Sequence, residues 1–239
     1  MTTLKTKPTL KIDWCTHEAA KYACENWHYS KCMPAGKTVK IGVWEDNKFT
    51  GVIIFSRGAT CEIGSPYGLD QTEICELTRI ALTKHKETVT RMVSIGLKML
   101  KKQNPGVKLV VSYSDLNQNH IGGIYQGGNW IYVGKAKDAS GSLIINGKQV
   151  HGRSVGAKYG TRSLAFIKRK VDPNAKFAES EGKNKYLYPL DYNIKQQIEK
   201  LRKPYPKRAS SVESGISEFH SEGGGESPTD ALQFSNEVL

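Results

Sequence analysis

The stretch "CELTRIALTKHKETVTRMVSIGLKMLKKQNPGVKLVVSYS", residues 75 to 114, contains a strand, a helix and a second strand in succession. "CELTRIAL" and "VKLVVSYS" are short β-prone runs, and apolar residues recur at helical spacing between about Thr88 and Gln103. "NPG" at 104–106 ends that helix. A strand–helix–strand unit with short connections predicts a parallel or mixed β-sheet flanked by helices. The expected fold class is therefore α/β (α+β).

The flanking sequence supplies further elements. A helix is predicted from its N-cap Thr16 to the "HYSKCMPAG" segment, and "TVKIGVWE" with "FTGVIIF" predicts a hairpin. Downstream, "NWIYVG" predicts a strand and "SLIINGKQVH" a second hairpin. "KYLYPLDYNIKQQIEKLR" predicts a strand followed by a short amphipathic helix.

The charge is unevenly distributed along the chain. The net charge of +12 divides into +18 for residues 1–208 and −6 for the tail, which has six acidic residues and no Lys or Arg. We predict a catalytic domain over 10–170, a basic C-terminal extension over 171–208 and a disordered acidic tail over 209–239. A basic excess of this size favours a polyanionic partner, although a solubilising surface gives the same composition.

Composition also bears on location. No apolar run approaches the length that spans a bilayer, and the first residues lack the apolar core of a secretory signal, so we expect no membrane partner. The five cysteines are an odd number and form no C-x-x-C pair, which favours reduced thiols. These features indicate a cytoplasmic protein.

Polar residues follow the strand "VVSYS" in the segment "DLNQNHIGGIYQGG". Side chains just beyond the carboxyl ends of parallel strands line the ligand crevice of such sheets, which makes Asp115 and Tyr125 candidate site residues. For Asn117 and Asn119 we expect ordinary cap and turn roles. Cys24, His28 and Cys32 follow each other at spacings of four, but this is not a usual zinc pattern, and structural cysteines are the better interpretation.

The order of these elements resembles the GNAT acyltransferase superfamily, and "YQGGNW" resembles its Y-x-x-x-G-[FW] segment. The resemblance implies a GNAT-like mixed sheet, acetyl-CoA or a related acyl donor, and Tyr125 as the acid that protonates the departing thiolate. The superfamily holds the donor's pyrophosphate on a glycine-rich loop at a helix N-terminus. This chain has "KHKETVTR" there, where the candidate donors are Lys84, Lys86, Thr88 and Arg91.

Three longer strings, "WHYSKCMPAGKTVKIGVWE", "ELTRIAL" and "YSDLNQNHIGGIYQGGNWIYVG", are similar to the phage Mom family of DNA-modification proteins. The resemblance implies a transferase that adds a carbamoylmethyl (acetamido) group to adenine N6 in phage DNA and protects that DNA from host restriction. The expected location is then the cytoplasm of the infected bacterial host. The family's catalytic His-Tyr and Asp-Tyr pairs fall on His28, Tyr29, Asp115 and Tyr125, and the family is thought to use iron.

The chemistry of this product makes its own demands. The N6 lone pair of adenine is delocalised into the ring, so attack benefits from a base, and Asp115 or His28 could serve. A carbamoylmethyl group bonds N6 to a methylene carbon, which plain acyl transfer does not deliver. A metal could supply the additional step, and His28, Asp115 and Tyr125 form an N/O ligand set that iron accepts.

Basic residues near the end of the body are candidates for contacts with double-stranded DNA. We expect "HGRSVGAKYGTRS" and "IKRK" to lie along phosphates through Arg153, Lys158, Arg162, Lys168 and Arg169. An ordinary GNAT N-acyltransferase acting on a protein or small amine is the first alternative function. A catalytically idle DNA-binding protein is the second. The sequence does not determine the oligomeric state.

Overall fold

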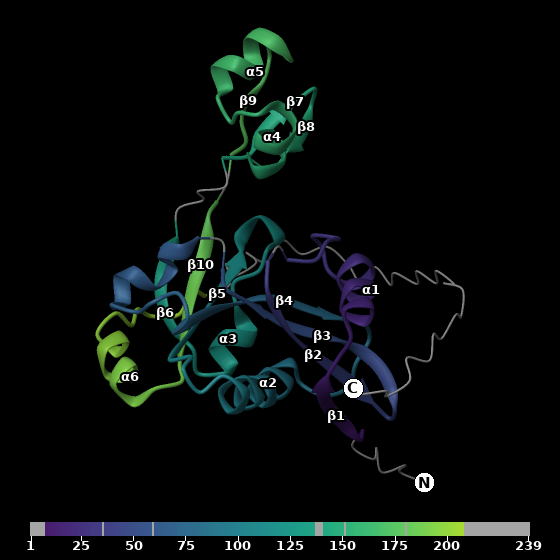
Figure 1. Ribbon diagram of the computed structural model, residues 1–239, viewed down its shortest axis with the longest axis vertical. Coiled ribbons are helices and arrows are strands. Elements are labelled where there is room, and N and C mark those ends of the chain that lie inside the picture. The colour runs from purple at the N-terminus through teal and green to yellow at the C-terminus, as the bar shows by residue number, and fades with distance from the viewer. Residues whose placement is uncertain are drawn as a thin grey trace, which may run out of the picture. The chain divides into compact units, whose positions relative to one another are not determined.

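The computed structural model describes residues 8–34, 36–58, 60–136, 141–150, 152–179 and 181–207 (Figure 1). The described chain divides into two compact units, one formed by residues up to 63 with 75–106 and the other by 64–74 with 107–205. The predicted acidic tail, 209–239, lies outside the described residues. Within the described ranges, no helix is both long and apolar enough to cross a membrane.

The first unit contains four strands, each antiparallel to the next: β1 (Leu10–Trp14), β2 (Thr38–Glu45), β3 (Lys48–Ser56) and β4 (Ile74–Leu82). The β2–β3 connection confirms the predicted hairpin. Its turn residues Asp46 and Asn47 both have positive φ, 50° and 64°. This is the backbone of a primed turn, whose twist matches that of the flanking strands, and Asp and Asn adopt it at little cost.

Helices α1 (His17–Trp27) and α2 (Val89–Gln103) cover opposite faces of this sheet. Thr16 begins α1 as predicted, because its hydroxyl accepts a hydrogen bond from the Ala19 N–H at 3.2 Å. Helix α1 packs on Val52 and Ile54 of β3, whereas Gly96 of α2 faces Ile53, the residue between them. Successive strand residues point to opposite faces, so each helix covers a different one. The buried residues of α2 are Met92, Val93, Gly96, Leu97 and Leu100.

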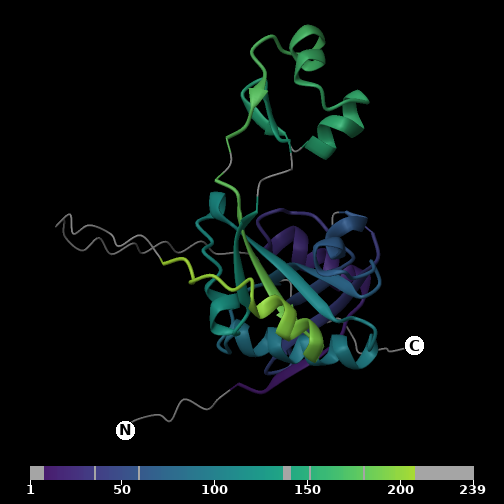
Figure 2. The same ribbon diagram turned by 90° about the vertical axis from the view of Figure 1, so that its left-hand side faces the viewer.

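The second unit contains β5 (Leu109–Asp115), β10 (Lys183–Pro189) and β6 (Ile131–Ala136), with β10 paired antiparallel to both neighbours. Short helices η2 (Leu116–Gln118) and α3 (Gly123–Gly127) follow β5, and α6 (Tyr192–Glu199) packs beside β10 (Figure 2). Residues 171–208, expected as a basic extension, therefore contain the central strand of this sheet. The short helix η1 (Cys61–Tyr67) precedes β4.

A small substructure interrupts the chain between β6 and β10, and we call residues 142–178 the insert. Strands β7 (Leu143–Ile145), β8 (Lys148–Val150) and β9 (Lys176–Phe177) form a separate sheet in the order β8-β7-β9. The β7–β8 pair confirms the second predicted hairpin. The basic segment that carries the predicted phosphate contacts forms α4 (Gly152–Tyr159) and α5 (Leu164–Lys170).

The predicted class, α/β (α+β) with a mixed β-sheet flanked by helices, is confirmed. Its physical origin is the alternation of strand runs and amphipathic helices that the sequence shows around residues 75–114. The relation to the GNAT fold stays a prediction.

Candidate functional site

Tyr125 is enclosed by other aromatic side chains of the second unit. It lies on α3, is 7% exposed, and packs against Trp130 and Tyr186 at ring-centroid distances of 5.1 Å and 5.0 Å. The Ser112 hydroxyl, on β5, donates a hydrogen bond to the Tyr125 hydroxyl at 2.8 Å. The phenol that the resemblance assigns as catalytic acid is thus held by packing and by one hydroxyl partner.

Gly122 sets the distance between this loop and the sheet. A Cβ at this position would lie 2.4–2.5 Å from ring and hydroxyl atoms of Tyr186, and the residue has φ +88°. Only glycine combines that backbone conformation with so close an approach. The Tyr186 hydroxyl in turn donates to the Ile121 carbonyl at 2.6 Å, which fixes the loop just before α3.

Asp115 lies at the end of β5 and begins η2. Its Oδ1 accepts a hydrogen bond from the Asn117 N–H at 3.1 Å, and in the sheet it pairs with Lys183 of β10. Asn119 ends η2 in the left-handed conformation, and the Asn117 side chain accepts a bond from the Glu181 N–H. The turn and cap role expected of Asn119 is confirmed, whereas the Asn117 side chain contacts a distant segment and caps no helix that the structure describes. Asp115 itself has a structural role that coexists with any catalytic one.

Sequence reasoning missed several buried polar residues beside Tyr125. Ser114 of β5 and Asn184 of β10 are cross-strand partners, 4% and 1% exposed, and the Asn184 side chain accepts a hydrogen bond from the Tyr132 hydroxyl at 3.1 Å. The Asn184 amide nitrogen has no hydrogen-bond partner within the described chain, and the Ser114 hydroxyl interacts with that of Tyr186. Each buried unpaired polar atom costs about 1–3 kcal/mol. The alternation of Ser112 and Ser114 in an otherwise apolar strand was the available signal.

His28 and Tyr29 lie in the first unit, at the end of α1. His28 is the C-cap and is 8% exposed, while Tyr29 is half exposed, with ring centroids 4.4 Å apart. The Ser30 N–H donates to His28 Nδ1 at 3.0 Å. Nδ1 is therefore an acceptor, and the neutral imidazole carries its proton on Nε2. Before Nε2 could act as a base or metal ligand, the proton would have to leave that nitrogen.

The four predicted catalytic residues thus form two pairs, His28–Tyr29 in one unit and Asp115–Tyr125 in the other. Neither unit alone contains the whole predicted iron set. Within the described ranges, no three His, Cys, Asp or Glu side chains form a group that could hold a metal. Iron therefore stays a prediction.

The loop predicted to hold a pyrophosphate binds a carboxylate of the protein itself. Glu45, 8% exposed at the end of β2, accepts hydrogen bonds from the N–H groups of Lys86 and Glu87 at 2.8 Å and 2.7 Å. The side chain of Arg91 pairs with that of Glu87, and Thr88 is the N-cap of α2 without a side-chain cap bond. Lys84 is exposed. An anion at these amides would have to displace Glu45, and a role in donor binding stays a prediction.

Glu45→Gln is expected to destabilise the protein by about 1–3 kcal/mol, because one of the two buried N–H groups then faces an amide NH₂ instead of an oxygen. The free energy of unfolding in urea measures this. Glu62→Gln, at an exposed position in η1, is the matched control and should change it by less than about 0.5 kcal/mol. Equal effects of the two substitutions would show that the Glu45 carboxylate does not hold the loop.

The Cys24–His28–Cys32 spacing does not place these residues on one helix. Helix α1 ends at Trp27, Cys24 is fully buried in the core, and Cys32 lies in the exposed segment that follows. Burial raises the pKa of the Cys24 thiol to about 11, so at neutral pH it stays protonated. The structural interpretation of Cys24 is confirmed by its place in the core.

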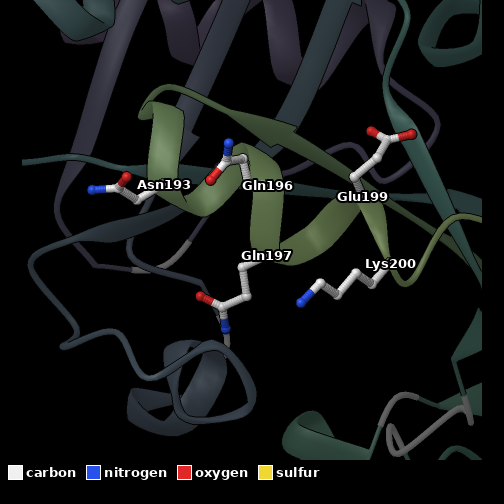
Figure 3. Close-up of a pocket in the computed structure, with 5 residues that line it drawn as sticks. All are labelled: Asn193, Gln196, Gln197, Glu199 and Lys200. Carbon is white, nitrogen blue, oxygen red and sulfur yellow. The ribbon is translucent and has the colours of Figure 1, made fainter.

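A shallow pocket in the second unit is lined by residues of α6 and the residue that follows it (Figure 3). Its lining consists of Asn193, Gln196, Gln197, Glu199 and Lys200. None of these was predicted as a site residue, and none has a described contact with Tyr125, Trp130 or Tyr186. We assign it no function.

The DNA-contact candidates all lie in the insert. Lys158 is on α4, Arg162 in the α4–α5 turn, and Lys168 and Arg169 on α5, all with exposed side chains. Arg153 lies in α4, but its side chain is outside what the structure describes.

Fold and site together define an α/β protein whose candidate site is a loop of polar and aromatic side chains at the end of a buried strand. No curated protein matches the chain. The model of the Mom protein family matches residues 9–207, and the chain belongs to that family. The resemblance to the Mom family that the sequence showed is thereby confirmed.

Proposed function

We propose that this chain is a transferase that adds a carbamoylmethyl (acetamido) group to adenine N6 in phage DNA and so protects the DNA from host restriction. The observation that carries the proposal is the family match over residues 9–207, since Mom proteins are associated with phage DNA modification. The substrate is then double-stranded DNA, and the reaction takes place in the cytoplasm of the infected bacterium.

Asp115 and Tyr125 have chemically complementary roles in this proposal. The Asp115 carboxylate takes the proton that adenine N6 loses as its bond to the methylene carbon forms. The Tyr125 phenol, held by Ser112, gives a proton to the leaving group. A donor whose methylene carbon already bears the leaving group makes this displacement redox-neutral. Acetyl-CoA alone does not meet this requirement, because its methyl carbon bears no leaving group and its acyl carbon carries no amide nitrogen.

The supporting geometry is the loop after β5. Asp115 and Tyr125 belong to one compact unit, which also contains the buried polar side chains of Ser114 and Asn184. A buried polar atom without a partner in the protein can be satisfied by water or by a bound group. We propose His28 and Tyr29 as further catalytic residues on the family resemblance alone.

Mass spectrometry of nucleosides tests the proposal. Plasmid DNA from cells expressing the protein should contain deoxyadenosine enlarged by one carbamoylmethyl group, and DNA from cells with the empty vector should not. N6-acetyl-deoxyadenosine would instead indicate plain acyl transfer. Unmodified DNA together with an acylated protein or small amine would replace the proposal by the N-acyltransferase alternative. Metal analysis of the purified protein tests the predicted iron.

A further inference from the structure

The insert is not needed to connect the strands on either side of it. Strands β6 and β10 are antiparallel neighbours, and Ala136, the last residue of β6, pairs with Lys183, the first residue of β10. A two-residue turn is enough to join such a pair. Residues 137–182 come between them instead. The connection is therefore far longer than the pairing of β6 with β10 requires, and it contains strands and helices of its own.

The insert has its own core and its own polar ties. The Ala178 N–H donates to the Ser142 carbonyl at 2.9 Å and closes the substructure where it begins. Buried Asp172 accepts hydrogen bonds from the N–H groups of Asn146 and Asn174 at 2.7 Å and 2.8 Å. The buried apolar core is formed by Leu143, Ile145, Val155, Ile167 and Ala175.

The surface of the insert is strongly basic. Residues 142–178 contain eight Lys and Arg residues and a single acidic residue, Asp172, whose carboxylate is used inside. The stem of Arg162 lies against Gly156 of α4, where a Cβ would be 3.2–3.4 Å from it. Seven cations have described, exposed side chains: Lys148, Lys158, Arg162, Lys168, Arg169, Lys170 and Lys176.

These cations differ from many others on the described surface in having no acidic partner. Elsewhere Lys21 pairs with Glu25, Lys108 with Glu73 and Arg202 with Glu199. None of the seven forms an ion pair with any residue that the structure describes. Like charges crowded on a small substructure repel one another and favour a partner of opposite charge. A surface that served only solubility would not need all of its charges to have one sign.

We propose that the insert is the docking element for duplex DNA, whose phosphates its lysines and arginines bind, while the chemistry takes place in the body of the protein. The inference rests on the proposed function for the identity of the polyanion. Strand β10, which follows the insert, begins at Lys183, and Lys183 pairs in the sheet with Asp115. The docking element is therefore attached to the sheet one strand away from a candidate catalytic residue.

Two triple variants of the full chain test this. The first is Lys168→Gln, Arg169→Gln and Lys170→Gln on α5. The second is the control Lys37→Gln, Lys98→Gln and Lys102→Gln, three exposed cations of the first unit that form no ion pair with a described residue. Both variants lose the same net charge. The measurement is the affinity for a mixed-sequence duplex at several salt concentrations, with circular dichroism as the check on folding.

The α5 variant should lose about 10²–10³-fold in affinity near 0.1 M salt, and its log–log salt slope should become shallower by about 2–3, since each phosphate contact contributes about 0.9. The control should stay within about twofold to threefold of the parent. Equal losses in both variants, or none in the α5 variant, would overturn the proposal. The binding assay requires no catalysis. If the parent chain modified DNA while the α5 variant kept the parent's DNA affinity, only the docking role would be refuted. If the parent chain bound DNA but produced no modified nucleosides, and the α5 variant lost binding, only the proposed reaction would be refuted.

Discussion

Tyr125→Phe should lower adenine modification about 10²–10⁴-fold, the range expected when a positioned general acid is removed. The substitution deletes one hydroxyl and leaves the ring packed against Trp130 and Tyr186. It also leaves the Ser112 hydroxyl without this acceptor. The free energy of unfolding should therefore fall by only about 1–3 kcal/mol. Modified deoxyadenosine per total deoxyadenosine, measured with time in DNA from expressing cells, reports the activity.

Ser112→Ala is the matched control, because it removes the same hydrogen bond from the other side and keeps the phenol. Its effect on stability should resemble that of Tyr125→Phe, while its activity should fall by less than about tenfold. If both variants lost activity equally, the hydrogen bond rather than the acid would be responsible. Full activity of Tyr125→Phe would remove Tyr125 from the catalytic residues.

Asp115→Asn should reduce modification by a similar factor, about 10²–10⁴, because the amide cannot take a proton from N6. Asn is as good an N-cap as Asp, so the bond from the Asn117 N–H and the start of η2 should survive. Stability should change by less than about 1 kcal/mol. The substitution therefore separates the charge of Asp115 from its capping role.

The chain offers a matched control for this substitution as well. Asp191 caps α6 in the same way, accepting from the Ile194 N–H at 3.1 Å, and has no predicted catalytic role. Asp191→Asn should leave both activity and stability nearly unchanged. An active Asp115→Asn variant would mean that capping is the whole role of Asp115. If that variant retained stoichiometric iron, Asp115 would not be an essential ligand.

Local patterns were sufficient for most elements of the fold. Thr16 starts α1, the Asp46-Asn47 turn joins β2 to β3, and "NPG" ends α2, all because the relevant contacts lie within a few residues. The position of β10 between β5 and β6 could not be predicted in this way, because it depends on pairing with strands far away in sequence. Helix α4 was missed because Gly156 interrupts its apolar spacing, and α5 because its seven residues are too few to show a helical period.

The candidate site was predictable only in part, for a related reason. The polar loop after β5 identified Asp115 and Tyr125, since the change in composition is visible in one segment. Asn184 and Tyr186 reach the candidate site only because β10 pairs with β5 in this register, and no local sequence pattern encodes that register. The contact of the Glu45 carboxylate with the amides of residues 86–87 likewise joins distant segments, and the loop sequence alone does not indicate it.

The pairing of Ala136 with Lys183 has a practical consequence for engineering. Because these two residues are paired, the connection 137–182 can be replaced by an Asn-Gly turn without disrupting the pairing of β6 with β10. Such a truncated protein would have to bind DNA without the insert. The same junction would accept a foreign zinc finger or homeodomain in place of residues 137–182. The grafted domain would then determine which DNA sequences are modified, independently of the residues that carry out the modification.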